Sequence, residues 1–200
     1  RLKILDIFNA IRGAGMATLD IVMVCVAAGI VIGVLGISGL GFNLTFTLVQ
    51  IGQGSLAMLL FLAAGVCIVL GMGLPTVGVY VLLATLVAPA LVEVGIQPIA
   101  AHLYVMYFGM MSMITPPVAI AAFAAAGLAE TDPMKTGWAA VQFGWMAYVV
   151  PFLFVLSPTL LLIGESGAIF LAVVTAIAGV WLVSIAIAGY FVRAVPVPLR

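Results

Sequence analysis

Charged side chains are scarce in this chain, and their scarcity is the strongest constraint on its class. Lys, Arg, Asp and Glu together make up 6% of the 200 residues, whereas 66% of the residues are hydrophobic. Soluble domains carry about 25% charged and about 45–50% apolar residues. A water-soluble fold of this length could not bury so much apolar surface, because such a domain leaves much of its surface in water. The composition therefore indicates that lipid surrounds most of the protein.

Residue patterns for nucleic-acid binding, zinc binding and catalysis are missing as well. The formal net charge is zero and no basic patch with interleaved aromatic residues occurs, so nucleic acid is not an expected partner. One His and two distant Cys residues cannot form a zinc site, and no cofactor is expected. Because no carboxylate pair, Ser/His dyad or HExxH pattern occurs, an enzyme is the least favoured class.

Long uncharged runs predict an all-α integral membrane protein with about four to six hydrophobic segments, since about 20 apolar residues span the ~30 Å hydrocarbon core. The expected segments are an interfacial amphipathic helix over 1–17, a transmembrane helix over 18–41, a re-entrant helical hairpin over 55–92, a discontinuous transmembrane helix over 99–129, and transmembrane helices over 137–162 and 168–192. The first segment is equally compatible with a solvated linker helix. A polar connection is expected over 41–54.

Two of these segments contain a break. As a single helix, residues 55–92 would be about 55 Å long, too long to span the membrane once. This segment therefore makes either two passes or a re-entrant hairpin with its tip at Gly71–Thr76. The arms of 99–129 are shorter, about 13–15 residues each, so one broken helix can cross once with some tilt.

The basic residues give a consistent topology. All six lie within 1–12, at Lys135 and within 193–200. If Arg12 is cytoplasmic, the predicted spans put every Lys and Arg on the cytoplasmic side, as the positive-inside rule requires. The hairpin and the double pass both return to the same side, so the charges do not distinguish them.

The first break, within 71–76, predicts a cation site. In hydrocarbon an unpaired backbone group costs several kcal/mol, so non-helical backbone is tolerated only where protein buries it or a watery cavity lies beside it. Gly71 and Gly73 allow a sharp turn that exposes carbonyl oxygens, which suit a hard cation such as sodium. Thr76 is predicted to cap the helix that follows.

The second break, within 112–117, has a similar composition. Thr115 is predicted to cap the next helix, with Pro116 in its first turn, while Ser112 adds a hydroxyl. Helix N-termini suit a carboxylate, so Thr76, Thr115, Pro116 and Pro117 are the predicted substrate residues. Several secondary transporters build their sites from such paired discontinuous segments. The alternative is that both breaks are only kinks.

Both breaks occur in the string GMGLPTVGVYVLLATLVAPALVEVGIQPIAAHLYVMYFGMMSMITPPVAIAAFAAAG, which is followed by DPMKTGW. This region resembles the large permease of tripartite ATP-independent periplasmic transporters, most closely the fused branch that works with TAXI-type binding proteins. The resemblance implies an elevator-type sodium symporter of the inner membrane, built from two inverted repeats. The chain would be the second repeat, the C-terminal half of a longer permease.

The resemblance also implies roles for the break residues. Sodium, the coupling ion, would be held by oxygens around Gly71, Gly73, Thr76, Ser112 and Thr115. Pro116 and Pro117 would keep the unwound backbone open.

The implied cargo is a small organic anion, a carboxylate, delivered by an extracytoplasmic solute-binding protein. Further implied partners are a small membrane subunit or its fused equivalent, and the first repeat of the same permease. The dicarboxylate branch often has an acidic residue before the hairpin Thr, whereas Leu74 and Pro75 precede Thr76 here, so the resemblance does not by itself imply the substrate of that branch. The alternative function is a structural or channel-like membrane subunit without sodium coupling.

Overall fold

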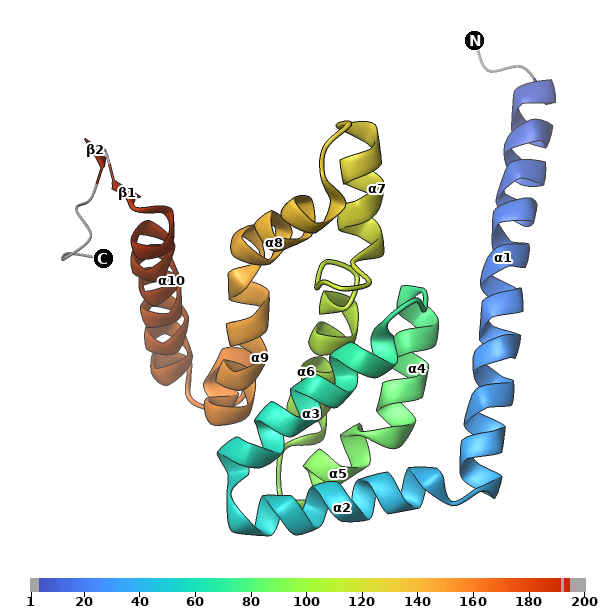
Figure 1. The fold of residues 1–200 in the computed structure, drawn as a ribbon. Helices are drawn as coiled ribbons and strands as arrows, with labels where there is room; N and C mark the ends of the chain where they lie inside the picture. The colour runs from blue at the N-terminus through green and yellow to red at the C-terminus, as the bar shows by residue number, and fades with distance from the viewer. Residues whose placement is uncertain (1–3, 192, 195–200) are drawn as a thin grey trace.

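The computed structural model describes residues 4–191 and 193–194, and it has the expected all-α fold (Figure 1). The elements are α1 (Ile4–Ile37), α2 (Leu40–Gly54), α3 (Leu56–Gly71), α4 (Thr76–Leu86), α5 (Ala88–Glu93), α6 (Pro98–Met111), α7 (Ile120–Leu128), α8 (Pro133–Phe143), α9 (Trp145–Leu156), the 3-10 helix η1 (Pro158–Leu161), α10 (Ser166–Ala188), and the strands β1 (Tyr190–Phe191) and β2 (Arg193–Ala194). The two short strands pair antiparallel.

The N-terminal region differs from the predicted segments. Residues from the expected interfacial helix 1–17 and most of the expected span 18–41 form one continuous helix, α1. Glycines within this helix do not end it, because a Gly in a helix costs only about 1 kcal/mol relative to Ala. The chain turns at Gly39, whose φ is 69°. The predicted polar connection over 41–54 is then helical, as α2.

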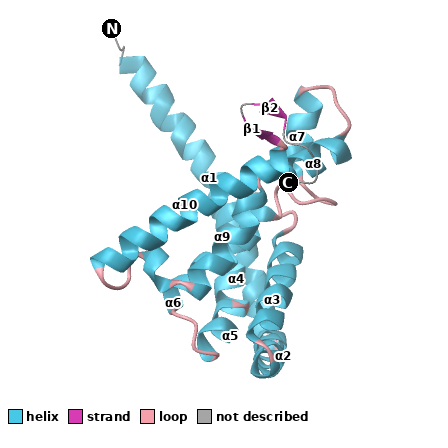
Figure 2. Cartoon of the chain, turned by 90° about the vertical axis from the view of Figure 1, so that its left-hand side faces the viewer, coloured by secondary structure: helices cyan, strands magenta, loops and turns pink. Residues whose placement is uncertain are grey.

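Apolar side chains cover much of the exterior, as expected for a protein in lipid. Within the described residues, α10 is the one helix that is by itself long and apolar enough to cross a membrane. Two bent helix pairs raise the number of possible spans to three. Figures 1 and 2 show α1 extending away from the other helices, and its exposed side chains include Phe8 and Met23.

The segment 55–92 folds back on itself at residues 72–75. Ser55 caps the start of α3, where its hydroxyl accepts from the backbone N–H of Met58 at 3.4 Å. The two arms of the hairpin, α3 and α4, contain 16 and 11 residues. At about 1.5 Å per residue they are about 24 Å and about 17 Å long, shorter than the ~30 Å hydrocarbon core. These lengths favour a re-entrant hairpin over two passes; its depth in a membrane stays a prediction.

The segment 99–129 is discontinuous. It consists of α6, a non-helical stretch over 112–119, and α7. The segment 137–162 is also interrupted, because α8 and α9 meet at Gly144 with a bend of 41°. Asp132 caps α8 by accepting the backbone N–H of Lys135 at 2.8 Å.

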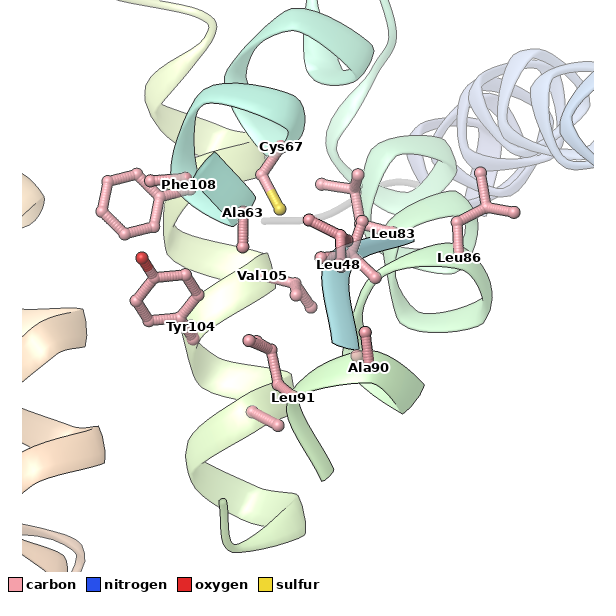
Figure 3. Close-up of a cluster of buried hydrophobic side chains, with 14 of the residues drawn as sticks. Leu48, Ala63, Cys67, Leu83, Leu86, Ala90, Leu91, Tyr104, Val105 and Phe108 are labelled. Carbon is pink, nitrogen blue, oxygen red and sulfur yellow. The ribbon is translucent and has the colours of Figure 1, made fainter. Parts of the chain in front are cut away.

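The buried core forms around α6, which packs against α3, α4 and α9. Figure 3 shows buried side chains of α3, α4 and α6 in this cluster. Tyr104 of α6 is fully buried, and its hydroxyl donates to the Leu60 carbonyl of α3 at 2.6 Å. The rings of Tyr104 and Phe108 each lie 5.5 Å from the ring of Phe152 on α9, centroid to centroid. These contacts fix the position of α6, and with it the second break at its C-terminal end.

Candidate functional site

The two breaks lie side by side in the fold (Figure 1). The contact is made by Gly71, the last residue of α3. A Cβ atom on Gly71 would lie 2.7 Å from the carbonyl oxygen of Gly109 and 2.9 Å from Oγ of Ser112. Real Cβ atoms essentially never approach other atoms within 3.0 Å. A residue without a side chain is therefore needed where α3 meets the end of α6.

A second glycine brings α6 close to α4. A Cβ atom on Gly109 would lie 2.5 Å from Cγ1 of Val79 and 2.7 Å from Cδ1 of Leu83. Small residues permit such close helix packing in membranes. Gly71 and Gly109 together allow α3, α4 and α6 to meet at the level of the breaks.

The first break is a tight turn over 72–75. Gly73 has a φ of 80°, a left-handed conformation that costs other residues roughly 1–2 kcal/mol. Two backbone hydrogen bonds close the turn. The N–H of Met72 donates to the Val69 carbonyl at 3.3 Å, and the N–H of Leu74 donates to the Gly71 carbonyl at 3.4 Å. Within the described residues, the carbonyl oxygens of Met72, Gly73 and Leu74 accept no hydrogen bond. The turn thus exposes carbonyls, as its glycines predict.

The predicted capping role of Thr76 is wrong. Thr76 is the first residue of α4, and the N-cap position belongs to Pro75, which provides no side-chain cap. Pro75 has an extended backbone with a φ of −73° and a ψ of 156°, so the helix begins at Thr76, one residue earlier than a Thr76 cap requires. Thr76 is exposed, and its hydroxyl makes no hydrogen bond to any described residue. The first-turn N–H groups of α4 therefore lack a side-chain acceptor.

Ser112 lies at the junction of the breaks. It is 1% exposed, and its hydroxyl donates to the Gly109 carbonyl at 2.6 Å. The single hydroxyl proton is used in this bond, so the oxygen keeps two acceptor lone pairs.

The predicted capping role of Thr115 is also wrong. The helix that follows, α7, begins at Ile120 with Ala119 as its N-cap, and no side chain caps it. Residues 116–119, including two prolines without N–H groups, separate Thr115 from that helix. The Thr115 hydroxyl instead donates to the Met111 carbonyl at 2.5 Å and lies 2.7 Å from the hydroxyl of Tyr148 on α9.

Pro116 and Pro117 lie in the loop of the second break and are joined by a cis peptide bond. The prediction that Pro116 occupies the first turn of a helix is wrong, because α7 starts only at Ile120. Pro116 packs on α8, where a Cβ atom on Gly137 would lie 2.9 Å from its Cγ. Pro117 is exposed.

Neutral oxygen atoms are the chemistry that this arrangement offers. The following carbonyls of the second break accept no hydrogen bond from the described part of the chain: Ser112, Ile114, Thr115, Pro116, Pro117 and Val118. Among the described residues, no group of three or more His, Cys, Asp or Glu could hold a metal ion. Unwound carbonyls and hydroxyls without carboxylates suit a monovalent hard cation better than zinc.

Gly109 and Tyr148 belong to the site but were not predicted from the sequence. Gly109 lies inside a run of large apolar residues, where a lone glycine indicates close helix packing. Tyr148 carries a hydroxyl within the apolar segment 137–162, and a buried hydroxyl needs a partner. Neither signal identifies the contacting helix.

Comparison with known proteins identifies a family. Residues 1–169 match the family model described as "Tripartite ATP-independent periplasmic transporter, DctM component". No curated protein and no solved structure matches the chain. The matched region covers most of the chain, including both breaks and the helices that contact them. The chain therefore belongs to the DctM family, the large permease component of tripartite ATP-independent periplasmic transporters.

Proposed function

We propose that this chain is part of a sodium-coupled secondary transporter of the inner membrane that takes up a small organic anion, a carboxylate. Membership of the DctM family supports a permease in a membrane and implies a solute-binding protein and a small membrane subunit as partners. The proposal adds the sodium coupling, the carboxylate cargo and delivery of that cargo by an extracytoplasmic protein.

The observation that carries the proposal is the contact of Gly71 with Gly109 and Ser112. Because of this contact, the unpaired carbonyls of two interrupted helices lie in one region of the fold. Unwound carbonyls of discontinuous helices are the ligands that coordinate sodium in secondary transporters. The arrangement supports a sodium-binding region with oxygens from both breaks, around Gly71, Gly73, Thr76, Ser112 and Thr115.

The helix starts after the breaks support an anionic cargo. Pro75 and Ala119, the N-cap residues of α4 and α7, have no side-chain acceptor for the first-turn N–H groups. Free N–H groups and the helix dipole both favour a carboxylate at such a position. The substrate would then meet the breaks near Thr76, Thr115, Pro116 and Pro117. Bound sodium would offset the charge of the carboxylate.

The test is uptake into proteoliposomes that contain the full-length permease, its small subunit and its binding protein. A panel of radiolabelled mono- and dicarboxylates is offered under an inward sodium gradient or an equal potassium gradient. We expect uptake of at least one carboxylate with sodium and none above background with potassium. Equal uptake under both gradients would reject sodium coupling and leave the alternative, a membrane subunit whose breaks are only kinks.

A further inference from the structure

Tyr148 belongs to a line of residues along one face of α9. Gly144, the N-cap residue of α9, is followed by Tyr148 and Phe152 at a spacing of four, and this spacing puts Tyr148 and Phe152 on the same side of the helix. Both ends of this line contact α6 or its break. A Cβ atom on Gly144 would lie 2.8 Å from Cδ1 of Ile114 in the second break, and the ring of Phe152 packs on Tyr104 of α6. The rotation of α9 is therefore fixed, with Tyr148 facing the second break.

The hydrogen bonds of Thr115 give Tyr148 a defined role. A threonine hydroxyl has one proton and two acceptor lone pairs. Thr115 uses its proton in the 2.5 Å bond to the Met111 carbonyl, so Tyr148 must donate across the 2.7 Å contact. One lone pair of Thr115 then remains, and no proton can point along that direction. A cation that approaches the break meets an oxygen lone pair.

We propose that Tyr148 is a positioning residue for sodium: its hydroxyl fixes Thr115 so that the free lone pair faces the break. This inference rests on the proposed sodium-coupled function. Tyr148 acts through Thr115 and is not itself a ligand. In Tyr148→Phe, Thr115 keeps its bond to Met111, but nothing links its hydroxyl to α9, so the oxygen is less well placed for the cation.

The experiment is a sodium titration of the purified full-length permease complex by isothermal titration calorimetry. Sodium chloride replaces potassium chloride at constant ionic strength, so no organic substrate is needed. We expect Tyr148→Phe to raise the Kd for sodium about three- to tenfold, the usual size of one hydrogen bond. The same shift is expected for Tyr148→Met, which removes the hydroxyl with different packing.

Tyr107→Phe is the matched control. Tyr107 lies on α6, and its ring packs on Phe154 of the same α9 at 5.9 Å, centroid to centroid. Its hydroxyl makes no hydrogen bond to a described residue, so its removal should leave the sodium Kd unchanged. A Kd shift in Tyr107→Phe equal to that in Tyr148→Phe would show a general packing effect and overturn the inference.

Combining Tyr148→Phe with either of two Thr115 substitutions tests whether Tyr148 acts through Thr115. The Kd increase caused by Tyr148→Phe should persist in Thr115→Ser, which keeps the hydroxyl, and vanish in Thr115→Val, which lacks it. The inference is wrong if Tyr148→Phe leaves the Kd as in the native protein, or shifts it equally in both backgrounds. If the native complex binds no sodium, the proposed function itself fails. If sodium binds and only the Tyr148 result is negative, the proposed function stands.

Discussion

The first break, residues 72–75, and the second break, residues 112–119, both interrupt hydrophobic helices, but the neighbouring helices hold them differently. In the first, backbone bonds and the left-handed Gly73 set the shape, and the Thr76 hydroxyl is exposed without a partner among the described residues. In the second, Thr115 is bonded to both α6 and α9, and Ser112 is buried and bonded to α6. Side-chain hydrogen bonds thus hold the Thr115 and Ser112 hydroxyls of the second break in place, whereas no such bond holds the Thr76 hydroxyl beside the first.

The largest effect is expected for Gly71→Ala, which disrupts the contact between the two breaks. Gly71→Ala puts a Cβ atom 2.7 Å from the Gly109 carbonyl, and this backbone oxygen cannot move aside easily. Overpacking of this kind costs about 1–3 kcal/mol. We expect a lower apparent melting temperature for the purified permease, measured by intrinsic fluorescence, and weaker sodium binding.

Gly65→Ala in the same helix is the control for this substitution. Nothing lies within 4 Å of a Cβ atom on Gly65. Its melting temperature should match that of the native protein, or exceed it slightly because Ala is a better helix former than Gly. If Gly71→Ala and Gly65→Ala behave alike, the two breaks do not pack as tightly as described.

The next largest effect is a difference in stability between substitutions of Thr115 and Thr76. Thr115→Val leaves the Tyr148 hydroxyl without its partner, which costs about 1–3 kcal/mol. Thr76→Val removes an exposed hydroxyl without a hydrogen bond and should change stability by less than about 0.5 kcal/mol. Thermal unfolding of both variants measures the contrast. Equal destabilisation would show that the first break is held as firmly as the second.

The smallest effect concerns the shape of the first break alone. Gly73→Ala forces a side chain into the left-handed conformation at a φ of 80°, at a cost of roughly 1–2 kcal/mol. Gly73→Asn should cost less, because Asn tolerates this conformation better. Space does not decide the difference, since nothing lies within 4 Å of a Cβ atom there. Melting temperatures in the order Gly, Asn, Ala are expected; a melting temperature for Ala above that for Asn contradicts the turn geometry.

Composition and local breakers predicted the fold class and both interruptions. The small number of charged residues indicated a protein surrounded by lipid. The glycines and prolines at 71–76 and 112–117 predicted helix interruptions where the structure has its turns. The helix boundaries were less predictable. Nothing in the sequence stops α1 near residue 17, and the polar residues of 41–54 do not prevent α2 from forming.

The details of the site depended on tertiary contacts. Both threonines were predicted as helix caps, a local role, but Pro75 shifted the start of α4 and the double proline separated Thr115 from α7. The Thr115 hydroxyl is hydrogen-bonded to the hydroxyl of Tyr148, which lies 33 residues further along the chain. Local spacing carries no information about such a contact, so the sequence identified the hydroxyl but not its orientation.

Under the proposed function, the two breaks form one sodium-binding region. The most direct test is a double-mutant cycle on the sodium Kd of the full-length permease complex, with Thr76→Val, Thr115→Val and the double variant. Residues that share one ligand show coupling of about 0.5–3 kcal/mol, whereas independent sites add within about 0.3–0.5 kcal/mol. We predict that both single variants weaken sodium binding and that their effects are not additive. Additive effects, or a native Kd in either single variant, would contradict a shared site.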